Sequence, residues 1–146
     1  MARRTNLRRN GRAKGGKLGK GAGGSGTTES LRAPAPLLWC ELDGFVPGHT
    51  VRVFLSSPES CPKLRGLEGV IFDAKNGGVE IHIDRSCPED VQRVTLMHEL
   101  MHAAVWTGGD VTAAEEKQIE RIAPGLLEGL LHLGFCFPSK PNEEEI

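Results

Sequence analysis

Three short apolar runs in the middle of the chain predict β-strands. They lie at residues 51–55, 70–72 and 79–84. The last run alternates strictly, so that Val79, Ile81 and Ile83 share one face, as in a strand with a buried side. An Asn-Gly-Gly sequence at residues 76–78 is typical of a tight turn. Residues 69–84 are therefore predicted to form a β-hairpin.

The spacing of apolar residues becomes helical after this hairpin. Pro88, followed by two acidic residues, is typical of a helix start, and the two glycines at residues 108–109 are typical of a helix end. A helix is therefore predicted over about residues 88–106. Its apolar residues fall on more than one side, which is typical of a helix buried in the body of a domain.

A second helix is predicted over about residues 113–132. Thr112 and Glu115 form a capping-box pattern at its start, and Pro124 is expected to kink or split it. The Pro-rich stretch at residues 33–48 is expected to be irregular. Short strands followed by two helices predict an α+β fold with a small mixed β-sheet.

The chain consists of a basic part and an acidic part, although its net charge is close to zero. The net charge of the 146 residues is −1, yet residues 1–32 hold nine basic residues and one acidic residue. The remainder holds nine basic and 18 acidic residues. Residues 1–32 also hold eight of the 19 glycines, so they are expected to be a disordered basic Gly-rich arm. A folded domain is expected over residues 33–137, and an acidic polar tail over residues 138–146.

Composition also limits the location and the partners of the protein. No apolar run reaches the ~18 residues of a membrane helix, and the basic start lacks the apolar stretch of a signal peptide. We expect a cytoplasmic, monomeric protein that does not bind a membrane. The arm at residues 1–32 is a candidate for nucleic-acid binding, because clustered Lys and Arg release counterions from phosphate. A solubilising leader or a tether has the same composition.

One motif carries specific chemistry: His98-Glu99-Leu100-Met101-His102 is a His-Glu-x-x-His sequence inside the first predicted helix. Residues four apart lie one turn apart on the same helix face, so His98 and His102 can bind one metal ion. Glu99 points to the side of this pair, where it can act on water instead of binding the metal. Zinc is the expected cofactor, because it lowers the pKa of bound water toward ~7.

This motif resembles that of the zincin metallopeptidases, and more narrowly that of small zincin-like proteins of bacteria and phages. The resemblance covers about residues 50–132. It implies a small sheet, an active-site helix with the motif, and a following helix that supplies the third metal ligand. Val105 and Gly108 stand where a metzincin has Gly and His, and His132 is followed by Leu133, unlike the SprT-like pattern. An acidic third ligand remains, as in gluzincin-type sites.

Three glutamates near the start of the second predicted helix are candidates for this ligand. Glu116 shares a stripe with Ile119 and Leu127, so it is expected to face the core and is the preferred candidate. Glu115 stays the alternative, although its capping-box position favours contact with the helix start. Glu120 is expected to face solvent.

These residues predict a zinc-dependent metallopeptidase that hydrolyses a protein or peptide substrate. His98, His102 and Glu116 are the expected ligands of Zn²⁺, and Glu99 is the expected general base. The alternative is a catalytically inactive zinc-binding module, or a nucleic-acid-associated binding protein that uses the basic arm.

Two further expectations concern how the substrate is handled. The chain has no tyrosine to stabilise an oxyanion, so His82, on the polar face of its strand, is a candidate transition-state donor. An exposed strand histidine is the simpler interpretation of His82. An extended substrate is expected to pair with an edge strand around residues 79–83.

Overall fold

The structure, a computed structural model, describes residues 2–4, 32–106 and 111–142. Its elements are β1 (Ala2–Arg4), β2 (Leu37–Val46), β3 (His49–Ser56), the 3-10 helix η1 (Pro62–Leu64), β4 (Gly69–Asp73), β5 (Val79–Asp84), α1 (Glu89–Ala104) and α2 (Ala113–His132). The fold is α+β, as the sequence predicts. Expectations for residues 5–31 and 143–146 lie outside the described residues.

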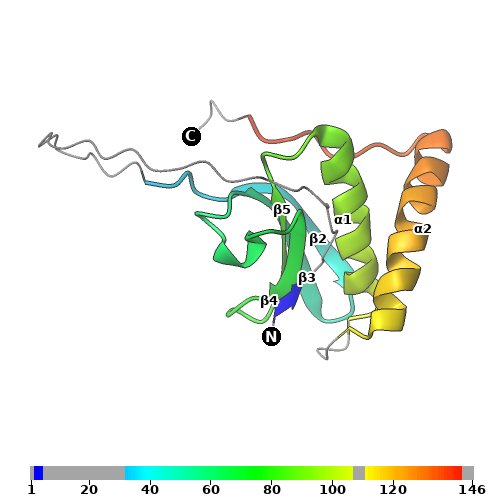
Figure 1. Cartoon of the computed structure of the whole chain (residues 1–146), viewed down its shortest axis with the longest axis horizontal. Helices are drawn as coiled ribbons and strands as arrows, with labels where there is room; N and C mark the ends of the chain where they lie inside the picture. The colour runs from blue at the N-terminus through cyan, green and yellow to red at the C-terminus, as the bar shows by residue number, and fades with distance from the viewer. Residues whose placement is uncertain (1, 5–31, 107–110, 143–146) are drawn as a thin grey trace, which may run out of the picture.

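The five strands form one mixed sheet in the order β1-β4-β5-β3-β2. The β3–β5 pair is parallel, and the other neighbouring pairs are antiparallel. Figure 1 shows α1 against one face of this sheet and α2 on the far side of α1. The helix that carries the His-Glu-x-x-His motif is therefore the middle layer of the fold.

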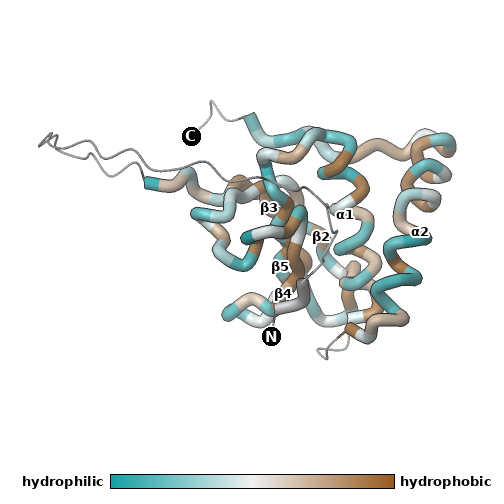
Figure 2. The backbone as a smooth tube through the Cα atoms, in the orientation of Figure 1, coloured by the Kyte–Doolittle hydropathy of each residue, from teal (hydrophilic) through white to brown (hydrophobic). Residues whose placement is uncertain are grey.

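Alternation along β5 divides the core between the two faces of the sheet. Val79, Ile81 and Ile83 are fully buried and belong to the main core with Leu96 of α1. The opposite face is covered by the segment around η1, where Leu64 is fully buried. Figure 2 shows that the apolar strands lie in the middle of the molecule. Both faces of β5 are therefore covered.

The predicted hairpin and both predicted helices are present. β4 and β5 pair antiparallel with Ile71 opposite Ile81, and Gly77 in the turn has a φ of 86°, which favours glycine. Both helices lie within the predicted ranges, and α1 ends two residues earlier than predicted. Pro124 does not split α2, which continues as one helix from Ala113 to His132.

A buried side chain fixes the start of α1. Pro88 stands at the N-cap and makes no side-chain hydrogen bond there. The Gln92 side-chain amide instead donates to the carbonyl oxygens of Arg85 and Cys87, at 3.2 and 2.9 Å. These bonds hold the connection from β5 against the first turn of α1, which sets where the motif lies over the sheet.

The expectation of irregular structure at residues 33–48 is wrong for most of that range. β2 lies within it and pairs antiparallel with β3. The register shifts between Leu38 and Cys40 and again between Asp43 and Val46. These two irregularities break the period of two that a regular strand shows, so the sequence pattern carries no strand signal there.

The basic arm also differs from its expectation where the structure describes it. Ala2–Arg4 forms β1, which pairs antiparallel with β4 along its outer side. These three residues are therefore described as a strand, and the expectation of disorder for residues 5–31 of the arm lies outside the described residues. The pairing uses backbone groups, which need no apolar side chains, so composition gives no sign of it.

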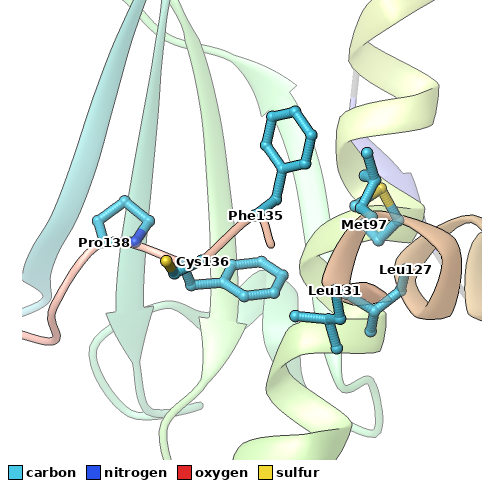
Figure 3. Close-up of a pocket in the computed structure, with 8 residues that line it drawn as sticks. Met97, Leu127, Leu131, Phe135, Cys136 and Pro138 are labelled. Atoms are coloured by element: carbon cyan, nitrogen blue, oxygen red, sulfur yellow. The ribbon is translucent and has the colours of Figure 1, made fainter. Parts of the chain in front are cut away.

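The segment after α2 packs against β2. The Trp39 indole donates to the carbonyl oxygen of Pro138 at 3.0 Å, and the rings of Trp39 and Phe137 stack with centroids 6.1 Å apart. An apolar cavity of about 170 Å³ lies between this segment and the two helices, lined by Met97 and Leu127 among others (Figure 3). Contacts with the sheet thus continue one residue past the expected domain boundary at residue 137.

Candidate metal centre

α1 places the two histidines of the motif side by side in the interior. His98 and His102 are 3% and 2% exposed, and their Nε2 atoms lie 3.0 Å apart. Their ring centroids are 4.8 Å apart at an interplanar angle of 64°. The spacing of four residues on one helix produces this approach.

The start of α2 brings Glu116 to the same point. Its Oε1 lies 3.0 Å from His98 Nε2, and its Oε2 lies 3.0 Å from His102 Nε2. Ligand atoms of the three residues all lie within 4.8 Å of one another. In the part of the chain that the structure describes, this is the one group of three or more His, Cys, Asp or Glu residues that could hold a metal ion.

The orientation of Glu116 follows from the packing of α2. Ile119, Ala123 and Leu127 are buried, and the last two pack with Met97 of α1. Glu116 lies three residues before Ile119 on the same stripe, so this packing turns its carboxylate toward α1. The stripe that selects Glu116 in the sequence is therefore the stripe that positions it.

Glu115 makes a different contact from its neighbour Glu116. The Thr112 hydroxyl accepts a hydrogen bond from the Glu115 N–H at 3.2 Å, as an N-cap residue does. The Glu115 carboxylate was expected near the helix start, yet its Oε1 lies 3.7 Å from His102 Nδ1. It therefore faces the second ring nitrogen, where a carboxylate typically orients a metal-binding histidine. Sequence reasoning missed this contact.

Burial favours the neutral imidazole, the form that binds a metal. It lowers the pKa of His98 to about 4, and repulsion from His102 adds to the shift. Burial also raises the pKa of the Glu116 carboxyl, and Glu120 and Glu115 add to the rise. A negative charge on Glu116 is unfavourable there without a cation, as is typical of a site built around one.

These three side chains could hold a metal ion, and their geometry can be compared with that of a zinc site. Zinc binds His nitrogen and carboxylate oxygen at about 2.0–2.2 Å in a tetrahedron, so ligand atoms around one ion lie about 3.3 Å apart. The observed separations of 3.0 Å are close to this value, and the two Glu116 contacts use different carboxylate oxygens, Oε1 toward His98 and Oε2 toward His102. Three protein ligands leave one position for water or substrate, as in catalytic rather than structural zinc sites.

Glu99 follows His98 in the sequence and lies on the side of α1 that faces the sheet. It is fully buried, and a Cβ atom added at Gly69 would lie 3.3 Å from its Oε1. The missing side chain at Gly69 therefore lets β4 approach the Glu99 carboxylate closely. Sequence reasoning missed Gly69, although a glycine before a run of apolar strand residues can signal such an approach.

The prediction that His82 acts at the metal centre is wrong. His82 lies on the face of β5 opposite α1, where Ser56 Oγ lies 2.7 Å from Nδ1 and Glu80 Oε2 lies 3.1 Å from Nε2. Its ring lies between those of Phe54 and Phe72, at centroid distances of 4.9 and 5.1 Å. It is only 6% exposed, so the simpler interpretation of an exposed histidine is also wrong.

The expected substrate strand around residues 79–83 is wrong as well. β5 pairs with β4 on one side and with β3 on the other, so its backbone offers no edge to a peptide. The hairpin pattern predicts the first pairing. The parallel pairing with β3 joins segments that are far apart in the sequence, and no local pattern encodes it.

Known proteins give no independent guide to this site. Comparison with protein-family models, with curated proteins and with solved structures finds no significant match. Among the described residues, the helices are too short or too polar to cross a membrane. The geometry of the side chains therefore carries the functional argument.

Proposed function

We propose that the protein is a zinc-dependent peptide hydrolase. The observation that carries the proposal is the convergence of His98, His102 and Glu116 at contacts of 3.0 Å. Glu99, buried beside them, supplies a carboxylate outside the ligand set. Two histidines, an acidic residue from the next helix and a separate glutamate are the parts that the zincin resemblance implies.

The chain's own residues account for binding and for proton transfer. His98, His102 and Glu116 would hold the zinc ion, which would supply Lewis acidity to polarise a carbonyl and lower the pKa of water toward about 7. Glu99 takes a proton from the attacking water through a carboxylate oxygen as the water oxygen bonds to the carbonyl carbon. Glu99 then delivers this proton to the leaving nitrogen as the C–N bond breaks. The Glu115 carboxylate faces His102 Nδ1 at 3.7 Å, and it would orient the imidazole on closing to hydrogen-bond distance.

Two substitutions separate metal binding from hydrolysis. Glu99→Gln is expected to keep zinc affinity and to lower the rate of peptide hydrolysis by about 100-fold or more, the usual contribution of a general base. His98→Ala removes a ligand and is expected to lose both zinc and hydrolysis. His132→Gln is the control, because the His132 side chain is 84% exposed. Native mass spectrometry measures zinc content, and a fluorogenic peptide library measures hydrolysis.

The outcomes distinguish the proposal from its alternatives. A chain that binds no zinc at neutral pH would contradict it. Zinc binding without hydrolysis of peptides or unfolded protein would support the inactive zinc-binding module instead. Nucleic-acid binding by residues 1–32 stays a prediction, tested by whether their removal abolishes salt-sensitive binding to DNA or RNA.

A further inference from the structure

The strand β4 runs alongside the part of α1 that carries the metal motif. At its start, a Cβ atom added at Gly69 would lie 2.5 Å from Thr95 Cγ2 and 3.3 Å from Glu99 Oε1. At its end, the Asp73 carboxylate accepts a hydrogen bond from the Trp106 indole at 3.0 Å. The two contacts fix β4 beside α1 from the turn before the motif to the residues that follow it.

Helix geometry places the two histidines toward the β4 side of α1. An α-helix turns by about 100° per residue, so the pair His98 and His102 lies only about 60° around the helix from the pair Thr95 and Glu99. Met97 lies on the opposite side of the two histidines from Thr95 and Glu99, and it packs against α2. An extended peptide on the outer side of β4 would therefore run along the flank of α1 nearest the metal ligands.

The outer side of β4 is taken by the chain's own β1. The register places Arg4 opposite Val70, the residue after Gly69, so β1 reaches the level of the contact with Glu99. An edge strand binds any extended segment through its backbone N–H and C=O groups. β1 therefore uses the groups that a peptide would use. It spans three residues, which is short for a strand.

Charge favours a basic occupant of this edge. β1 has the sequence Ala-Arg-Arg and belongs to a segment of 32 residues with nine basic residues and one acidic residue. Residues 33–146 carry nine basic and 18 acidic residues. Residues 33–146 therefore carry a net negative charge. Long-range electrostatic attraction to them favours a basic segment at this edge, whether it belongs to the same chain or to a separate peptide.

We propose that β1 is an autoinhibitory strand that occupies the β4 edge on which an extended basic peptide binds. The substrate has to displace β1 before it can reach the metal centre. This inference rests on the proposed function and adds two things to it, a substrate class (extended segments rich in Arg and Lys) and an internal competitor.

Paired substitutions in β1 test the competition. Neighbouring strand residues point their N–H groups in opposite directions, so Arg3→Pro with Arg4→Pro removes whichever N–H faces β4. Arg3→Thr with Arg4→Thr is the matched control, because it removes the same charges and keeps both N–H groups and strand propensity. Circular dichroism melting curves check that both full-length variants are folded.

The probe is a fluorescein-labelled peptide, MARRTNLR, which has the sequence of residues 1–8. It is titrated into each full-length chain by fluorescence anisotropy in EDTA, where metal-dependent hydrolysis cannot consume it. We expect the proline variant to bind at least tenfold more tightly than the threonine variant. We also expect the bound peptide to protect the amide hydrogens of Val70 and Phe72, or that of Ile71, from exchange.

Equal affinity of the two variants, no binding to the proline variant, or binding without protection in β4 would each overturn the proposal. Hydrolysis with zinc is measured separately, and we expect the proline variant to show a lower KM with kcat unchanged. A proline variant that binds the peptide as expected but hydrolyses none refutes the proposed function. It still supports competition between β1 and the peptide for the β4 edge.

Discussion

Two neighbouring glutamates contact opposite nitrogens of one histidine. Glu116 lies at Nε2 of His102, and Glu115 lies at Nδ1. Loss of a residue that orients a metal-binding histidine costs about 10–100-fold in metal affinity. We expect Glu115→Gln to lower zinc affinity within this range and Glu116→Gln, which removes a ligand, to lower it further. Competition with a chromophoric chelator measures both.

Glu120→Gln is the matched control for these two variants. It removes the same negative charge from the same helix, and Glu120 is not one of the proposed metal ligands. An equal loss in Glu115→Gln and Glu116→Gln would contradict the division of roles between them. A loss as large in Glu120→Gln would show that net charge, rather than contact with His102, sets the affinity.

The buried His82 is expected to support the fold and not the metal centre. Its ring fills the space between Phe54 and Phe72, and it is hydrogen-bonded to Ser56. His82→Ala leaves a cavity and a buried hydroxyl without this partner, at a cost of about 2–4 kcal/mol in the free energy of unfolding. Urea unfolding measures this cost. Zinc affinity is expected to stay unchanged, and a large loss of it would contradict the placement.

The stability of the metal-free protein is expected to depend on pH through His98. Its pKa is lowered from 6.5 to about 4 in the folded chain, so the unfolded chain binds more protons in that window, and stability falls as pH falls. Each pKa unit corresponds to about 1.4 kcal/mol. The raised pKa of Glu116 acts in the opposite direction. Urea unfolding in EDTA at pH 7 and pH 5 should show a smaller loss for His98→Gln than for the unchanged chain.

Among the elements, the contact between β4 and α1 depends on the absence of one side chain. A methyl group at Gly69 would lie 2.5 Å from Thr95 Cγ2, so Gly69→Ala is expected to cost about 1–3 kcal/mol through overpacking. Thr95→Ser removes the clashing methyl group. The double variant should therefore recover part of this loss in urea unfolding. No recovery would mean that the cost arises elsewhere, for instance at Glu99.

The elements also show which parts of the structure a sequence can predict. α1 and α2 carry their own signals, a start at Pro88, a cap at Thr112 and a stripe that includes Ile119, and their residue ranges agree with the structure within two residues. The spacing of four residues predicts that His98 and His102 lie together. The apolar stripe favours Glu116 among the acidic third ligands that the zincin resemblance implies, and the structure brings these three residues together.

The sheet is where prediction from the sequence fails. Two register shifts in β2 remove the alternation that would predict it as a strand. The strand expected at the sheet edge, β5, lies in the interior of the sheet because it pairs in parallel with β3. His82 is misplaced for a related reason, since alternation shows which residues share a face but not which face meets α1. These features depend on contacts between distant segments, which the order of residues along one strand does not contain.

At the scale of the whole molecule, the proposed metal centre joins two layers that otherwise meet through apolar packing. His98 and His102 belong to α1, which contacts the sheet, and Glu116 belongs to α2, which packs chiefly on α1 (Figure 1). A metal ion bound to all three would connect the outer helix to the rest of the fold. Metal binding is therefore expected to be linked to global stability.

Zinc is expected to stabilise the protein against unfolding in proportion to its affinity. A ligand that binds only the folded chain adds about 2.7 kcal/mol at a free concentration 100 times its Kd. Because Glu116 is the ligand on α2, hydrogen exchange in α2 should slow more than exchange in β5, which is already held by pairing on both sides. His98→Ala should abolish both effects, and His132→Gln should retain them. Equal stabilisation of the His98→Ala chain would show that zinc acts elsewhere on the molecule.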